Sequence, residues 1–105
     1  MSKEKIEELS DKMEAINGLK RAPSQYQIFL FLLGSGRTLT VKEVANELGM
    51  TSKATERAIA KLVDKSLIQR ATFRAQSYSC DSKEILLGML LSLTDINERL
   101  SKKGI

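Results

Sequence analysis

The chain has 105 residues, 42% of them hydrophobic, a length and composition that predict one ordinary globular domain. It has no histidine, which removes the commonest general base and metal ligand, and its single cysteine, Cys80, excludes an internal disulfide. The formal net charge is +4, and the whole excess lies between Arg37 and Gln76, where basic residues outnumber acidic ones two to one. A positive field confined to one segment indicates a polyanionic partner.

The first predicted element is a helix over residues 3–19. Its apolar residues recur every three or four positions and so form a single stripe: Ile6, Leu9, Met13 and Ile16. Ser24 and Gln27 resemble a capping box, which predicts that a second helix begins there and ends at Leu33. Because this helix is apolar on nearly every side, we expect it to form the buried centre.

A second capping box, made by Thr40 and Glu43, predicts a helix that continues to about Leu48. Gly49 follows and can supply the positive φ that a tight connection between helices needs. Thr51 can then cap a third helix over residues 52–65. This spacing is typical of a helix-turn-helix unit, whose second helix is presented to the major groove of DNA.

Two short strands over residues 67–73 and 77–80 are predicted to form a wing around a polar turn. Asp81 with Glu84 is expected to cap a last helix over residues 82–102. The predicted fold class is therefore mainly α with a small β-wing (α+β), a winged helix-turn-helix. We expect a single winged-helix domain over residues 1–105, with an N-terminal helix in 1–22, the core in 23–80 and a dimerisation helix in 81–105.

The last helix is apolar on most sides in its first half, and its second half has the spacing of a coiled-coil seam. We expect it to pair with its two-fold mate in a homodimer, with the N-terminal helix alongside. The alternative is that the two terminal helices pack against each other within one chain. The residues predicted at the dimer interface are Ile6, Leu9, Met13, Ile16, Leu86, Met89, Leu90, Leu93, Ile96 and Leu100.

Candidate DNA-binding residues lie mainly at the start of the third helix, where side chains reach base edges most easily. Lys42 and Lys61 could contact phosphates, while Thr40 and Thr51 would cap helices first and contact phosphates second. On the wing we favour Arg74, because Arg70 lies nearer the sheet and could instead pair with a carboxylate. The alternative for each charged residue is a solvated surface role. The full predicted set is Thr40, Lys42, Thr51, Ser52, Lys53, Glu56, Arg57, Lys61, Arg70, Arg74 and Gln76.

The segment from Val44 to Leu62 and its flanks resemble winged-helix regulators of the group around the multiple-antibiotic-resistance regulator (MarR) family. Within that group the chain looks most like small archaeal regulators akin to the leucine-responsive regulator. The resemblance covers about Ser24 to Cys80. It implies a homodimer on operator or promoter DNA, with Ser52 to Lys61 as the recognition helix and Arg70 to Ser79 as the wing. Larger members carry extra helices that shape a ligand pocket, for which this chain has little room, so a small-molecule effector is not expected.

Taken together, the sequence predicts a dimeric, sequence-specific, double-stranded-DNA-binding transcription regulator without cofactor or metal. The alternatives are an architectural, chromatin-type DNA-binding protein of low specificity and a winged-helix module that binds proteins. An enzyme is disfavoured because no Cys–His or Ser–His pair can form. The charged N-terminus and the lack of a long apolar run lead us to expect a cytoplasmic, nucleoid-associated protein. Cys80 is expected to be a buried filler, with a redox sensor as the alternative.

Overall fold

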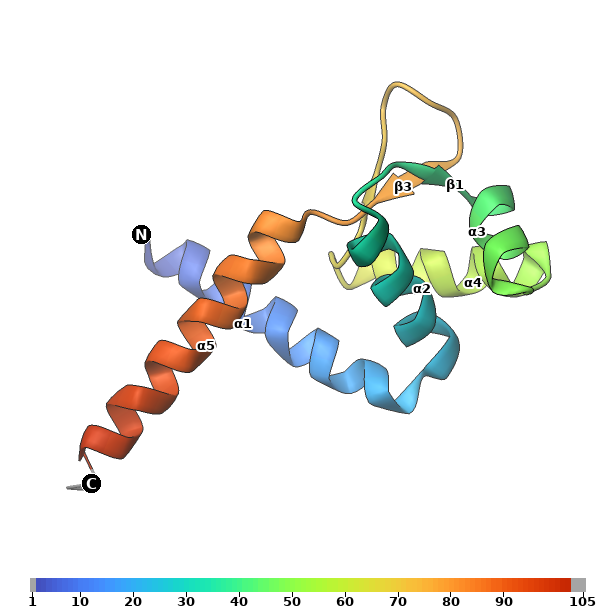
Figure 1. Ribbon diagram of the computed structural model, residues 1–105. Coiled ribbons are helices and arrows are strands. Elements are labelled where there is room, and N and C mark those ends of the chain that lie inside the picture. Colours follow the sequence, from blue (N-terminus) through green and yellow to red (C-terminus); the bar gives the residue numbers. More distant parts are fainter. Residues whose placement is uncertain (1, 103–105) are drawn as a thin grey trace.

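The computed structural model describes residues 2–102, and the side chains of residues 2–94. In chain order its elements are α1 (Lys3–Gly18), the 3-10 helix η1 (Leu19–Arg21), α2 (Pro23–Ser35), β1 (Leu39–Thr40), α3 (Val41–Leu48), α4 (Ser52–Asp64), β2 (Gln69–Arg70), β3 (Ser77–Ser79) and α5 (Ser82–Lys102). Helices α2, α3 and α4 gather with the small sheet, while α1 and α5 cross beside them (Figure 1). No helix in the described part of the chain is both long and apolar enough to cross a membrane.

Helix α2 begins two residues earlier than the predicted capping box, which placed the N-cap at Ser24. Pro23 is its first residue and Ala22 its N-cap, with no side-chain hydrogen bond to the helix. The predicted capping box at Ser24 and Gln27 is therefore wrong. The physical reason is that proline suits the first helical position, since its φ is already helical and it has no N–H that needs a partner.

The helix-turn-helix unit forms as its capping residues predict. The backbone amide of Glu43 donates to Thr40 Oγ1 at 3.1 Å, and the amide of Thr40 donates to Glu43 Oε1 at 3.0 Å. Gly49 has a φ of 64°, and Thr51 Oγ1 accepts from the amide of Ala54 at 3.1 Å. Both caps and the positive-φ turn are confirmed, so this part of the chain is fixed largely by local hydrogen bonds.

The sheet has three antiparallel strands in the order β1–β3–β2, one more than predicted. Its register pairs Leu39 with Tyr78, and Gln69 with Ser79. The strand predicted over residues 67–73 corresponds to β2 and pairs only at Gln69–Arg70, because Leu67 and Ile68 are buried in the core. The wing is therefore a loop over residues 71–76 that projects from short strands (Figure 1).

The core lies where α2 packs on α4 beneath the sheet. The fully buried residues of this core come from η1, α2, α3, α4 and the segment before β2, and include Leu19, Ile28, Phe29, Leu32, Val44, Ile59, Leu62, Leu67 and Ile68. Helix α2 supplies buried residues to the centre of the core as expected, but one of its sides is open to solvent, since Leu30 is 46% exposed.

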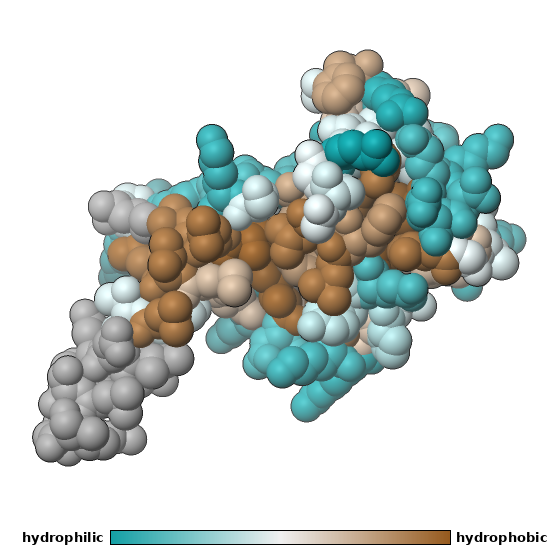
Figure 2. Space-filling model, viewed as in Figure 1, coloured by the Kyte–Doolittle hydropathy of each residue, from teal (hydrophilic) through white to brown (hydrophobic). Residues whose placement is uncertain are grey.

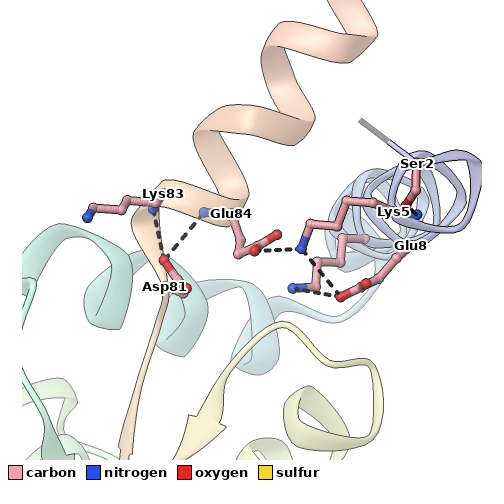
Figure 3. Close-up of polar contacts among 7 residues, drawn as sticks. Ser2, Lys5, Glu8, Asp81, Lys83 and Glu84 are labelled. Carbon is pink, nitrogen blue, oxygen red and sulfur yellow. Dashed lines mark hydrogen bonds and ion pairs between the residues drawn. The ribbon is translucent and has the colours of Figure 1, made fainter.

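Helix α1 packs against α5 within the chain. Leu9 is fully buried, and α5 approaches so closely at Gly88 that a Cβ there would lie 2.6 Å from Met13 Cε. An ion pair closes one end of this contact, because Lys5 Nζ lies 2.7 Å from Glu84 Oε1 (Figure 3). That hydrogen bond raises the pKa of Lys5.

This packing corrects part of the predicted dimer interface. Leu9 has no exposed surface, so its assignment to contact with a second copy is wrong, while Met13 and Ile16 are half-buried within the chain. Most of the α1 stripe is thus covered by α5 within the chain, and of its four residues only Ile6 is clearly exposed. The reason is that α5 has two apolar sides, one of which covers α1.

Asp81 caps the N-terminus of α5 as predicted: its Oδ1 accepts hydrogen bonds from the amides of Lys83 at 3.1 Å and Glu84 at 3.4 Å (Figure 3). The Glu84 carboxylate does not cap the helix together with Asp81, as the sequence predicted, but accepts a hydrogen bond from Lys5 instead.

Candidate nucleic-acid interface

Helix α4 has one buried side and one exposed side. Thr55, Ala58, Ile59 and Leu62 face the core, and Thr55 is satisfied there because its hydroxyl donates to the carbonyl of Thr51 at 2.8 Å. The opposite side is exposed and carries Ser52, Lys53, Glu56, Arg57, Ala60 and Lys61. The structure therefore brings together on one surface every candidate that the sequence placed on this helix.

Two hollows flank the exposed side of α4. Arg57 and Lys61 line one of them together with Pro23 and Gln25 at the start of α2. Glu56 lines the other, on the side of the sheet. The exposed residues of α4 thus form a ridge, a shape suited to enter a groove rather than to enclose a small ligand.

Arg70 lies in the hollow between α4 and the sheet, not at the tip of the wing. Its guanidinium donates to the Tyr78 hydroxyl at 3.2 Å and lies 5.7 Å from the centroid of the Tyr78 ring. A cation over an aromatic face is attracted by the ring electrons, which restricts where this arginine can point.

Among the residues that the structure describes, Arg74, and not Arg70, forms an ion pair with a carboxylate. Its Nη2 lies 2.9 Å from Glu43 Oε1, so the wing is joined to the first turn of α3. The carboxylate partner that the sequence analysis considered for Arg70 is thus found at Arg74. The two residues that pair are far apart in sequence, and only the sheet brings them together.

The wing loop is held at its C-terminal side by local bonds. Ser77 is buried, and its hydroxyl donates to the carbonyl of Arg74 at 2.7 Å. Gln76 has a φ of 50°, and its carbonyl accepts from the amide of Val41 at 3.3 Å. A positive φ is uncommon for a residue other than glycine. The two hydrogen bonds hold the backbone of Gln76 in this conformation and so direct the end of the loop into β3.

Glu43 has a second role that the sequence did not indicate, because the sequence analysis named it only as part of a helix cap. Its carboxylate accepts from the backbone amide of Thr40, from the Thr40 hydroxyl at 3.0 Å, and from Arg74. These contacts lower the pKa of Glu43, with the Thr40 amide as the largest cause. The Thr40 hydroxyl therefore has both a donor and an acceptor partner inside the chain, which leaves little for a phosphate.

The remaining candidates are exposed, and Lys42 lies next to the start of α4. Lys42 and Asn46 on α3 line a hollow with Gly49 and Ser52 at the turn. Thr51 and Gln76 are also exposed. No group of three His, Cys, Asp or Glu residues that could hold a metal ion occurs among the described residues.

Cys80 is buried, and its Sγ lies 3.5 Å from the carbonyl oxygen of Leu67. Burial raises the pKa of this thiol to about 11. Since the thiolate is the reactive form, this environment makes Cys80 a weak nucleophile.

Three helices, a three-stranded sheet and a projecting loop define a winged helix. A family model described as the MarR family matches residues 17–76, which is more than half of the chain. The chain belongs to the MarR family, and this membership indicates a DNA-binding transcriptional regulator. No curated protein and no solved structure matches the chain significantly.

Proposed function

We propose that the protein is a homodimeric regulator of transcription that binds double-stranded DNA at specific sequences, and that it is not an enzyme. The observation that carries this proposal is the exposed ridge of α4, which presents two basic side chains, Lys53 and Arg57, close to the N-terminal end of the helix. Helices of this unit read the major groove with their N-terminal residues.

In the proposed complex Arg57 and Lys53 contact base edges, with Ser52 and Glu56 beside them. Arginine can bond the two acceptors of a guanine at once, whereas glutamate accepts from cytosine. Lys42 and Lys61 contact phosphates on either side of the groove, with Thr51 nearby. Phosphate contacts fix position and base contacts give specificity, so the two groups of residues should respond differently to substitution.

On the wing, Arg74 and Gln76 are proposed to approach the neighbouring minor groove or phosphates. Arg74 is 47% exposed in its side chain although it is paired with Glu43. Arg70 is proposed to contact phosphate from the flank of α4 instead of from the wing tip, because it lies over Tyr78.

The proposed dimer forms through α5. Leu86, Met89, Leu90 and Leu93 are each between 52 and 58% exposed, although α1 already covers another side of the helix. A brown surface follows the described part of α5 (Figure 2). Contiguous apolar surface of this kind marks a protein contact, and two-fold pairing would place two α4 helices about 34 Å apart, on successive major grooves. The predicted coiled-coil residues Ile96 and Leu100 lie outside the described side chains.

The proposal also includes a cytoplasmic, nucleoid-associated location and a likeness to small archaeal regulators akin to the leucine-responsive regulator. Both rest on the sequence: the first on its charge, the second on the resemblance of its central segment. No small-molecule effector is included.

The test is a gel shift across a salt series, with duplexes enriched from a random-sequence library and with unselected duplex as competitor. We expect selected duplexes to be bound about 10³-fold or more tightly than unselected DNA. Arg57→Ala should relax the preference at one base position, a change of about 1–3 kcal/mol in discrimination. Lys61→Ala is the matched control and should weaken binding to all duplexes alike and reduce the salt slope.

Equal affinity for selected and unselected duplexes, with steep loss at higher salt, would replace this proposal with the architectural one. Absence of binding to any duplex at low salt would leave the protein-interaction module.

A further inference from the structure

The loop of the wing carries a large apolar residue that is exposed. Phe73 is 79% exposed, which is more than any other large hydrophobic side chain in the described part of the chain. It lies in the middle of the 71–76 loop, next to Arg74, and the loop projects away from the body (Figure 1). A phenyl ring in this position contributes nothing to the core, which favours a contact between Phe73 and another molecule.

The surroundings of Phe73 are basic. The segment from residue 65 to residue 76 carries Lys65, Arg70 and Arg74 and no acidic residue. Among the described residues the segment has one ion pair, between Arg74 and Glu43 on α3, which favours one position for the neighbour of Phe73. An apolar ring among basic residues is complementary to a partner surface that has an apolar interior between negatively charged edges.

The minor groove of duplex DNA has this combination, with phosphates along its edges and sugars and base edges inside. Apolar side chains can enter it as wedges between base steps, partly unstacking them and bending the duplex. The loop can support such a wedge, because the Ser77–Arg74 hydrogen bond and the Arg74–Glu43 ion pair hold the residue that follows Phe73.

We propose that Phe73 is an apolar wedge that enters the DNA minor groove and makes binding depend on how easily the contacted step unstacks. This inference rests on the proposed DNA-binding function and adds to it a specificity-determining residue on the wing. Flexible pyrimidine–purine steps should be preferred under the wing, since they unstack at least cost.

The first measurement compares Phe73→Ala with the native protein on a selected duplex. We expect about tenfold weaker binding, in the range found when an aromatic side chain loses contact with bases. Phe73→Leu should retain part of the affinity because it keeps an apolar wedge. Thr72→Ala, at the exposed neighbouring position, is the control for disturbance of the loop and should bind as the native protein does.

The second measurement uses fluorescence. The chain contains no tryptophan, so Phe73→Trp introduces a single indole at the tip of the wing. We expect its emission to be quenched on binding the selected duplex. Replacing guanine under the wing by inosine removes only the minor-groove amino group and should change the signal, whereas 7-deazaguanine alters only the major groove and should not.

The outcomes separate this inference from the proposed function. Tight, selective binding by the native protein with unchanged affinity in Phe73→Ala and unchanged Phe73→Trp emission would overturn the wedge and leave the regulator standing. Failure of the native protein to bind any duplex would overturn both. A Phe73→Trp emission shift with acidic lipid vesicles or with the protein's own concentration, but not with DNA, would overturn the wedge in favour of a membrane or a second copy.

Discussion

Gly49 shows how one residue sets the angle between α3 and α4. Its φ of 64° is costly for any residue with a Cβ, although the space around it is open. We expect Gly49→Ala to lower the free energy of unfolding by about 1–2 kcal/mol through backbone strain alone. Urea unfolding followed by circular dichroism measures this loss.

Gly18 is the matched control, because it also has open space around it but a φ of −67°. Gly18→Ala should be neutral or slightly stabilising, since alanine fits this conformation and restricts the unfolded chain. Equal destabilisation in both variants would mean that the positive φ is not the cause.

Cys80 gives a second prediction at the scale of one residue. With its pKa raised from 9.0 to about 11, the thiol carries about a hundredfold less thiolate at neutral pH than an unperturbed cysteine. We expect alkylation by iodoacetamide at pH 7.5 to be at least that much slower in the folded protein than in guanidinium, as followed by mass spectrometry. Fast alkylation of the folded protein would restore the redox-sensor alternative.

The sign of the pH effect on stability follows from the same shift. A raised thiol pKa means that the folded state holds the proton more tightly than the unfolded state. The contribution of Cys80 is therefore fully present below pH 9, and it is lost as the pH rises from 9 towards 11.

At the scale of elements, the contact between α1 and α5 depends on the absence of a side chain at Gly88. A larger residue there would meet the Met13 side chain. We expect Gly88→Leu to destabilise the protein by about 1–3 kcal/mol through overpacking. Met13→Ala in the same chain should recover part of this loss, and a double-mutant cycle from urea unfolding at fixed protein concentration measures the coupling.

Gly88→Ala serves as the graded control in this series. Its Cβ would press on Met13 Cε, the far end of a flexible side chain that can turn aside, so its effect should be small. Additive effects of Gly88→Leu and Met13→Ala would show that the two residues do not touch in solution.

The elements that could be predicted from sequence are those that depend on neighbouring residues. The Thr40–Glu43 box and the Thr51 cap each join residues three apart, and the sequence displays both. Strand β1 was missed because two residues show no periodicity, and its existence depends on Ser77 and Tyr78 far along the chain.

The candidate site also contains features that depend on neighbouring residues and features that depend on distant ones. The exposed ridge of α4 follows from helical periodicity, and all its predicted residues share one side. The Arg74–Glu43 pair and the position of Arg70 over Tyr78 depend on tertiary contacts between distant segments. No local pattern indicates either of them, which is why the sequence analysis did not find the carboxylate partner of Arg74.

At the scale of the whole molecule, the exposed apolar side of α5 predicts the oligomeric state. Leu90→Glu together with Leu93→Glu should yield a monomer in light scattering, because two buried carboxylates per chain would face each other across the proposed contact. Phe73→Glu places a charge on an exposed apolar residue of the wing, away from α5, and should leave the mass of the dimer unchanged.

The monomeric variant should also bind DNA more weakly, since each half-site alone supplies one α4 helix. A native mass of one chain in light scattering, or a dimer mass that survives both glutamates, would remove α5 from the proposed interface.

The connection between β3 and α5 is short and joins the winged-helix part of the molecule directly to α5. Only Cys80 and Asp81 separate the central strand of the sheet from the helix, and both are fixed, Cys80 against Leu67 and Asp81 at the first turn of α5. This joint has no slack. We therefore expect a tilt of α5 to be passed on to β3 and to the loop that precedes it, as in a lever whose long arm is α5 and whose short arm is the wing.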